Sequence, residues 1–366
     1  MKNDNNFLKN ISVSKHGIHD IILELTYKFN FHKLLLHGNL NMVFVALCIG
    51  LILFNNPTAT HIAQKLGWVS HDAITRPLPL ISVNNNNIII LFIQAIQSQT
   101  ACLGYLIIDD VIIRKPYGKS IFPTSYVYDH TNMINFVHKF GLAAEYVTFD
   151  TWYASKALLT LLKKHGYSYV CMIKNNRKVL YNNRFNFNVR TICLLHSKKQ
   201  FRYYPGTGFY IKAVTVILPG AGKVKLAIVK NGYNASIENT RFIITDMLDT
   251  PAQSIVKKYL CRWDIETFFR DIKQYLNFEK VQARDPKKLE GYFSAMFISF
   301  VFIQILQVQN NFNTVGETVS FLQDFVQIKV NNVVYIINVT SKHLNSKQVI
   351  DVTNPVATTI WDKLSA

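Results

Sequence analysis

Hydrophobic positions along the chain form two kinds of pattern, short unbroken apolar runs and longer runs with helical spacing. Two of the short runs end in carboxylates: residues 103–108 are followed by Asp109 and Asp110, and residues 146–149 are followed by Asp150. An unbroken apolar run of this length is typical of a strand that is buried on both faces. We therefore predict two buried strands, each with acidic side chains at its end.

The stretch from Tyr259 to Lys273 has helical spacing. At about 100° per residue, one polar stripe gathers an acid among several cations: Tyr259, Arg262, Glu266, Arg270 and Lys273. A neighbouring apolar stripe can pack on a core and consists of Ile265, Phe269, Ile272 and Leu276. The pattern is also typical of an ordinary amphipathic helix with an i,i+4 ion pair between Glu266 and Arg270.

Residues 176–247 alternate between apolar and polar positions, which predicts a β-rich segment. The predicted strands are 189–195, 209–218, 223–230 and 241–246. Aromatic residues lie among them, including Tyr203 and Tyr204 beside a Pro-Gly turn. We predict that these rings pack within a small sheet that the segment forms by itself.

Charge changes this picture, because the formal net charge is +18 and residues 151–237 contain fifteen Lys and Arg but no Asp or Glu. Such a surface attracts a polyanion. A charge run is usually a solvated face, but an acid-free run of this length favours contact with phosphates. Lys198, Lys199 and Arg202, which lie among the aromatic residues, are the candidate DNA-binding residues of this segment.

Residues 58–76 predict a helix, a turn at Gly67 and a second helix capped by Ser70. This outline is that of a helix-turn-helix, with His71, Thr75 and Arg76 as candidate DNA contacts. Pro77 ends the second helix early. Two short helices joined by a glycine are also common elsewhere.

Several classes of protein are not expected from the sequence. Residues 42–54 are apolar but too short to span a bilayer. Residues 291–308 carry recurring Ser and Gln, so we predict a core helix behind the sheet of the two predicted strands rather than a membrane span. The first sixteen residues are polar, and the five cysteines form no CxxC pair, so neither export nor a structural zinc site is expected. No phosphate-binding glycine motif occurs, which argues against a nucleotide cofactor.

The spacing of Tyr259, Arg262, Glu266 and Lys273 resembles the Tyr-x2-Arg-x3-Glu-x6-Lys signature of DDE transposases from bacterial insertion sequences. The resemblance implies that Glu266 is a metal-binding carboxylate and that Tyr259, Arg262 and Lys273 bind phosphates at the transposon end. Arg270 lies on the same stripe and joins the DNA-binding candidates.

The two strand-end motifs resemble the family's first and second acidic motifs. They imply Asp150 as the second acid and Asp110 as the first, with Asp109 as its backup because Val111 stands where the family usually has Thr. Asp110, Asp150 and Glu266 would then be the catalytic residues and would bind two Mg²⁺ or Mn²⁺ ions, which prefer hard oxygen ligands. In relatives that form hairpin ends, an aromatic residue of a β-rich insertion stacks on a flipped base, a role for Tyr203 or Tyr204.

The implied fold is α/β: an RNase H-like mixed sheet flanked by helices, interrupted by a β-rich basic insertion and preceded by a helical DNA-binding region. The expected divisions are 1–95 for the N-terminal region, 96–308 for the catalytic domain, about 176–247 for its insertion, and 309–366 for a tail. Only 40 residues separate Asp110 from Asp150, and 120–129 and 133–140 supply one strand and one helix there. This short interval indicates either a compact variant or a decayed copy.

The implied function is metal-dependent DNA cleavage and strand transfer at the ends of an insertion sequence. The expected partners are double-stranded DNA with terminal inverted repeats and a second copy of the chain, in the cytoplasm of a bacterium at its nucleoid. Two alternatives stay open, an inactive DNA-binding remnant of a transposase and a structure-selective RNase H-like nuclease.

Overall fold

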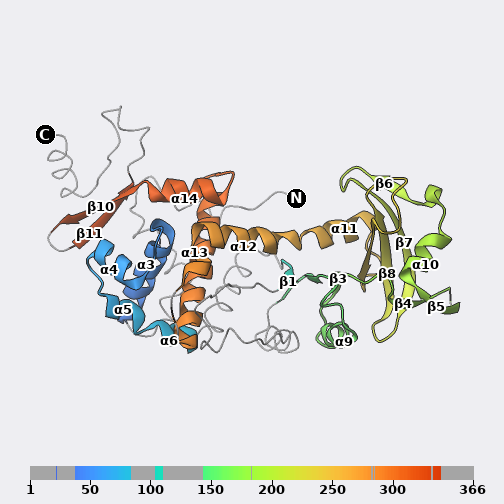
Figure 1. Cartoon of the computed structure of the whole chain (residues 1–366), viewed down its shortest axis with the longest axis horizontal. Helices are drawn as coiled ribbons and strands as arrows, with labels where there is room; N and C mark the ends of the chain where they lie inside the picture. The colour runs from blue at the N-terminus through green and yellow to red at the C-terminus, as the bar shows by residue number, and fades with distance from the viewer. Residues whose placement is uncertain are drawn as a thin grey trace. The chain divides into compact units, whose positions relative to one another are not determined.

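The computed structural model divides into two compact units (Figure 1). The first, here called the helical unit, comprises residues 1–101, 113–125 and 270–366, and the second, the sheet unit, comprises residues 102–112 and 126–269. The structure describes residues 22, 38–83, 104–109, 143–182, 184–281, 283, 285–330 and 333–338. Asp110 and the elements predicted at 120–129 and 133–140 lie outside the described residues.

The helical unit is built around α3 (Gly38–Leu53), whose residues 43–49 are all buried. Because α3 is apolar on every side, it must be enclosed by other helices. Its neighbours are α4 (Ala59–Leu66), α5 (His71–Thr75), α13 (Pro286–Gln309) and α14 (Val315–Gln323). A separate antiparallel pair, β10 (Phe325–Val330) and β11 (Val333–Asn338), follows α14.

The two predicted helices after residue 57 form with the predicted caps. The Thr58 hydroxyl accepts a hydrogen bond from the His61 amide at 3.2 Å, and Gly67 ends α4 with a φ of 71°. The Ser70 hydroxyl accepts from the Ala73 amide at 3.1 Å and starts α5, which is only five residues long. After Pro77 the chain turns directly into α6 (Leu78–Val83).

Helix α13 packs on α3, α6 and α14 within the helical unit. Gly291 permits this packing, since a Cβ atom there would lie 2.1 Å from the carbonyl oxygen of Leu78 in α6. Burial raises the pKa of Cys48 in α3 to about 12, although a hydrogen bond with Ser299 of α13 opposes the rise. Helix α13 is long and apolar enough to cross a membrane, but most of its apolar window is buried inside the protein.

The sheet unit contains one mixed sheet in the order β1-β2-β3-β9-β8-β7-β4-β5. Strands β1, β2 and β3 are parallel to one another, and every later pairing, including that of β6 with β7, is antiparallel. The strands are β1 (Leu106–Ile108), β2 (Val147–Phe149), β3 (Tyr169–Met172), β4 (Lys178–Tyr181), β5 (Arg184–Asn188), β6 (Arg202–Tyr204), β7 (Phe209–Leu218), β8 (Gly222–Lys230) and β9 (Thr240–Thr245).

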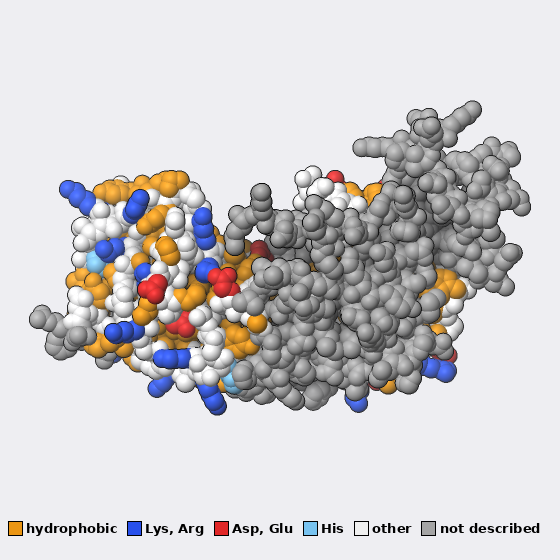
Figure 2. All heavy atoms as spheres, turned by 180° about the vertical axis from the view of Figure 1, so that it is seen from behind, with side chains coloured by type: hydrophobic (Ala, Val, Ile, Leu, Met, Phe, Trp, Pro, Cys, Tyr) orange, Lys and Arg blue, Asp and Glu red, His pale blue; other side chains and the backbone are white. Residues whose placement is uncertain are grey.

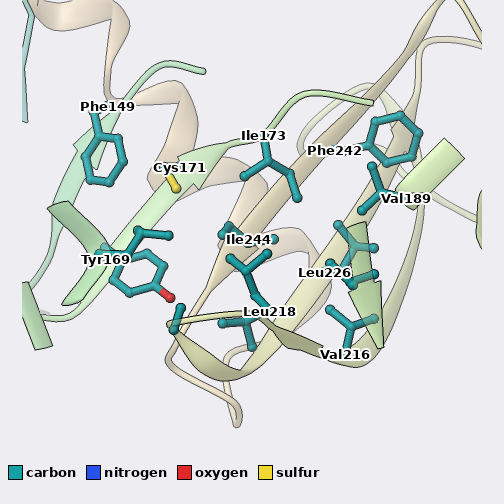
Figure 3. Packing of buried hydrophobic residues seen from close by; sticks show 14 of the residues in the cluster. Phe149, Tyr169, Cys171, Ile173, Val189, Val216, Leu218, Leu226, Phe242 and Ile244 are labelled. Atoms are coloured by element: carbon teal, nitrogen blue, oxygen red, sulfur yellow. The ribbon is translucent and has the colours of Figure 1, made fainter. Parts of the chain in front are cut away.

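Side chains alternate between the two faces of this sheet, and each face has its own core. On β3 and β9, Tyr169, Cys171, Phe242 and Ile244 belong to one core, which also receives α9 (Lys156–Lys164) and α10 (Val189–Leu195) (Figure 3). The alternate residues, such as Val170 of β3, face α11 (Ala252–Leu260) on the opposite side. The sheet is therefore a middle layer between helices.

Two predictions for residues 176–247 are wrong. Their strands do not form a sheet by themselves, because β9 pairs with β3 and so joins the β-rich segment to the parallel strands. Residues 189–195 form helix α10 rather than a strand. The buried residues Val189, Ile192 and Cys193 have the i, i+3, i+4 spacing of a helix, which the β-branched composition of this segment concealed.

Candidate active site

The two strand-end acids lie at the same edge of the sheet. Ile108 ends β1 and is the register partner of Phe149, which ends the parallel strand β2. Asp109 and Asp150 are the next residues after these partners. Because adjacent strands lie about 4.8 Å apart, the two residues begin neighbouring turns at one edge. The Asp150 carboxylate accepts the amide of Trp152 at 2.7 Å, which fixes the turn after β2.

Helix α11 covers one face of the sheet, and Asp150 lies on that face. Tyr146 at the start of β2 packs with Val256 and Tyr259 of α11, while Phe149 belongs to the opposite core. The alternation of β2 therefore puts Asp150 on the α11 face. Tyr259 is near enough to Asp150 for the carboxylate to act on its phenol electrostatically.

The predicted single helix over 259–273 is instead two helices, α11 and α12 (Trp263–Tyr275), joined at Cys261 and Arg262. Three amides at the junction bond to the third residue back: Arg262 to Tyr259 at 3.0 Å, Asp264 to Cys261 at 3.1 Å, and Ile265 to Arg262 at 3.2 Å. This is a tightened, 3₁₀-like turn. Tyr259 consequently lies in the last turn of α11, while Glu266 lies in the first turn of α12.

Arg262 connects the predicted acids to this junction. Its guanidinium donates to Asp109 at 3.3 Å and to Glu266 at 2.8 Å, and only 12% of its side chain is exposed. Burial lowers the pKa of Arg262, but the hydrogen bond to Glu266 and the nearby Tyr259 phenol outweigh it, so the pKa lies above its usual value. The buried Nε has no hydrogen-bond partner among the described residues.

Tyr259 adds a buried phenol to the same group. Its side chain is hydrogen-bonded to Arg262. Burial raises the pKa of Tyr259, and the Asp150 carboxylate raises it further, against the opposing effect of Arg262. The structure thus brings together four residues proposed from sequence, namely Tyr259, Arg262, Glu266 and the backup acid Asp109, with Asp150 beside them.

A second cluster, not found from sequence, holds α11 and α12 against the sheet. Tyr105 and Tyr146, which precede β1 and β2, stack with ring centroids 5.4 Å apart. Tyr105 donates to the Asp264 carboxylate, and Lys258 lies 4.4 Å above the Tyr146 ring and pairs with Glu145. The one sequence signal was a tyrosine at the start of each apolar run. These contacts fix the direction from which Arg262 reaches the acids.

The remaining predicted DNA-binding residues belong to other segments. Arg270 and Lys273 belong to the helical unit, where they pair with Asp271 at 3.2 Å and Glu279 at 3.0 Å. Lys198 and Lys199 lie in the 3₁₀ turn η2 (Lys198–Gln200), and Lys198 donates to Asn234 at 2.7 Å. Arg202 lies 5.5 Å from the centre of the Tyr204 ring.

Lys and Arg side chains are spread over the visible surface of the described residues, with fewer Asp and Glu between them (Figure 2). In the sheet unit this follows from the acid-free stretch 151–237. An ion pair at its border, Arg190 with Glu238 at 3.0 Å, uses the first acid after the stretch. The surface is accordingly suited to a polyanion.

The acidic side chains of the site are of the type that binds divalent metal ions, but the described ones do not form a metal-binding cluster. Within the described part of the chain, no three His, Cys, Asp or Glu side chains are grouped closely enough to hold a metal ion. Asp109 and Glu266 instead share the Arg262 guanidinium. Their oxygens, with those of Asp150, are the hard ligands that Mg²⁺ and Mn²⁺ prefer.

Known proteins resemble parts of this chain. Residues 114–302 match the family described as "Transposase DDE domain", a range that contains Asp150 and Glu266 and begins after Asp109 and Asp110. A segment of 85 residues is 29% identical to "Probable transposase for insertion sequence element IS5377" of Geobacillus stearothermophilus. That segment is 23% of this chain, and it spans 22% of the relative's length. Since the family match covers more than half of the chain, this protein belongs to the DDE transposase family of insertion sequences.

Proposed function

We propose that the protein cleaves DNA at the ends of an insertion sequence and joins those ends to a target. The observation that carries the proposal is the shared position of Asp109 and Asp150 at one sheet edge, with Glu266 tied to Asp109 through Arg262. Two strand-end acids and one helical acid form the donor set that phosphodiester chemistry with divalent ions requires.

The parallel order β1-β2-β3 also supports an RNase H-like core for the sheet unit. In that core the acids follow the carboxyl ends of adjacent parallel strands. The antiparallel strands β9, β8, β7, β4 and β5 extend the sheet on the β3 side. We propose that they are the insertion of the domain predicted at 96–308.

Asp109, Asp150 and Glu266 are the residues that we propose to hold Mg²⁺ or Mn²⁺, and Asp110 remains the alternative first acid. When bound, two such ions supply an activated nucleophile and charge stabilisation on the leaving oxygen. Arg262 now occupies part of this donor set. Its release towards a DNA phosphate would remove this cation from Asp109 and Glu266, whose oxygens would then be candidates to hold the ions, and Tyr259 would keep the guanidinium near the site.

The proposed substrate is double-stranded DNA with the element's terminal inverted repeats, bound by a homodimer in the bacterial cytoplasm. The acid-free stretch and the cations Lys198, Lys199 and Arg202 support contact with its phosphates. In α5, by contrast, Arg76 pairs with Asp72 at 3.1 Å, which weakens its role as a DNA contact. Arg270 and Lys273 would need to exchange Asp271 and Glu279 for phosphates.

A second candidate is an inactive DNA-binding remnant of a transposase. Two observations favour it. Arg262 forms ion pairs with Asp109 and Glu266, and the described residues contain no cluster of side chains that could hold a metal ion. The two candidates share a DNA surface and differ in catalysis. A structure-selective nuclease would share the catalysis but would not join strands.

The test is to incubate the protein with Mg²⁺ or Mn²⁺ and a duplex that carries its own element's terminal repeat. We expect nicking at the repeat and joining of a pre-cut 3′ end, both lost in Asp150→Asn and Glu266→Gln. Binding without nicking in every protein would support the remnant. Nicking without joining would support the nuclease, and nicking that survives Glu266→Gln would overturn the three-acid assignment.

A further inference from the structure

A pocket adjoins the turn after β2 and the loop after β3. Its volume is about 310 Å³, at the lower end of the range of roughly 300–1,000 Å³ seen for small-molecule sites. One wall is formed by the residues that follow Asp150, including Trp152 and Ser155, and the other by residues 173–178. The pocket is thus attached to the sheet edge at which the two acids lie.

Trp152 gives this pocket an unusual lining. Trp152 is 77% exposed. By contrast, Tyr153, the next residue in the chain, and Ile173, which lines the pocket after β3, are buried. The Trp152 amide is held by Asp150 at 2.7 Å, so the indole is presented from the same turn that orients the acid. An exposed indole on a fixed turn offers a flat surface on which a nucleobase can stack.

The other side of the pocket is cationic. Lys174, Arg177 and Lys178 line it, and among the described residues none of the three is paired with a carboxylate. The acid-free stretch 151–237 leaves no neighbouring acid in sequence to neutralise them. Asn176 adds an amide that can donate to or accept from a base edge.

We propose that this pocket binds one unpaired nucleotide of a DNA single strand, with its base on Trp152 and its phosphate towards Lys174 and Arg177. The proposal rests on the proposed function and names a subsite of it. Its volume, at the lower end of the range for small-molecule sites, favours a single nucleotide over the paired bases of a duplex. Its attachment to the Asp150 turn places the bound nucleotide beside the phosphate that the acids would attack.

This assignment differs from the role that the family resemblance gives to Tyr203 or Tyr204. Tyr203 is exposed, but its ring packs on Tyr210 at 5.0 Å, and Tyr210 in turn contacts Tyr233 at 5.7 Å. Tyr203 and Tyr210 are register partners on β6 and β7, and Tyr233 follows β8. They provide the matched control for Trp152.

The test uses a short single-stranded oligonucleotide with one 2-aminopurine, in EDTA, so that cleavage plays no part. We expect quenching of 2-aminopurine on binding, lost in Trp152→Ala and largely kept in Trp152→Phe and Tyr203→Ala. Loss of the stack should weaken binding by roughly 5- to 150-fold, the equivalent of 1–3 kcal/mol per base. Lys174→Gln with Arg177→Gln should weaken binding and lower its salt dependence.

Quenching that survives Trp152→Ala, or that is lost in Tyr203→Ala, would overturn the pocket assignment. So would an oligonucleotide that the unmodified protein does not bind. A catalytically dead protein that still shows Trp152-dependent quenching would overturn the proposed function and leave the pocket standing. Because Trp152 is exposed, its variants should unfold at the same temperature as the parent, which thermal unfolding checks.

Discussion

The guanidinium of Arg262 lies 3.3 Å from the carboxylate of Asp109, a residue 153 positions earlier in the chain. The same guanidinium holds Glu266 one turn later at 2.8 Å. Two acids that would otherwise repel each other therefore share one cation. Arg262 supplies positive charge at the position where divalent ions are proposed to bind.

Arg262→Gln should therefore destabilise the protein and make its stability depend more on divalent ions. Loss of the guanidinium removes the cation that Asp109 and Glu266 share, at a cost of about 1–3 kcal/mol. Added Mg²⁺ can replace the lost charge, so it should raise the melting temperature of the variant more than that of the parent. Thermal unfolding with and without Mg²⁺ measures both effects.

The matched control is Arg190→Gln, which breaks an exposed ion pair with Glu238 in the same unit. An exposed pair contributes about 0–1 kcal/mol, and Mg²⁺ should have no added effect there. Equal Mg²⁺ responses in parent, Arg262 variant and control would show that the carboxylates do not bind the ion.

Asp109→Asn and Asp110→Asn distinguish the two candidates for the first acid. Asp109 contacts Arg262, and its position after Ile108 matches that of Asp150 after Phe149. We expect Asp109→Asn to lose metal-dependent nicking by two or more orders of magnitude and Asp110→Asn to lose much less. The reverse result in the nicking assay would restore the assignment drawn from the family resemblance.

Charge reversal at η2 should weaken DNA binding through its salt dependence. Lys198→Glu with Lys199→Glu removes two cations from the acid-free stretch, so the slope of log K against log salt should fall by about 1–2 units. The control, Lys287→Glu with Lys288→Glu, makes the same charge change at the start of α13, where acids suit the helix terminus. Equal slopes for the two double variants would remove η2 from the proposed DNA surface.

Gly291→Ala tests the packing of α13 on α6. In an open helix this change would add about 1 kcal/mol of stability. At Gly291 the new methyl would lie 2.1 Å from the Leu78 carbonyl oxygen, so a net loss of about 1–3 kcal/mol is expected from overpacking. Gly232→Ala is the control, because nothing lies within 4 Å of its added methyl. Denaturant unfolding of both variants gives the comparison, and an unchanged Gly291 variant would contradict the close approach.

Local patterns predicted local structure well in this chain. The caps at Thr58 and Ser70 formed because their side chains need only an amide three residues away. Strands β7, β8 and β9 formed where apolar and polar residues alternate most strongly. Such alternation predicts a strand, because successive side chains of a strand point to opposite faces of the sheet. The strand-end acids were assigned through the family resemblance, because an Asp at the end of a strand is by itself more often a turn residue.

Relationships between distant segments were not predictable in the same way. The pairing of β3 with β9 joins residues such as Met172 and Ile243, and no local period encodes that partner. Helix α13 is apolar on most sides, so its sequence predicts burial but does not indicate which elements it packs against. In the structure it packs on α3 and α6. The Arg262 contact with Asp109 depends on the 3₁₀-like turn at Cys261. The helical spacing of residues 259–273 predicted one continuous helix and did not indicate this turn.

Asp246 offers a pH-dependent test of the sheet unit, away from the candidate site. Its carboxylate follows β9 and accepts the Tyr169 amide at 2.9 Å. Burial raises the pKa of Asp246 above its usual value, although the backbone hydrogen bonds and Lys163 oppose the rise. The folded protein therefore holds this proton more tightly than the unfolded chain, and it loses stability as the pH rises through the raised pKa.

Asp246→Asn keeps an oxygen acceptor for Tyr169 but cannot ionise. The variant should be more stable than the parent at neutral pH, with a difference that shrinks as the pH falls towards about 3.9, the value for an unfolded Asp. Asp246→Ala leaves the Tyr169 amide without its acceptor and should lose about 1–3 kcal/mol at every pH. Urea unfolding at a series of pH values measures all three proteins. An advantage of the Asn variant that grew on acidification would show that Asp246 is stabilised, not strained, by its burial.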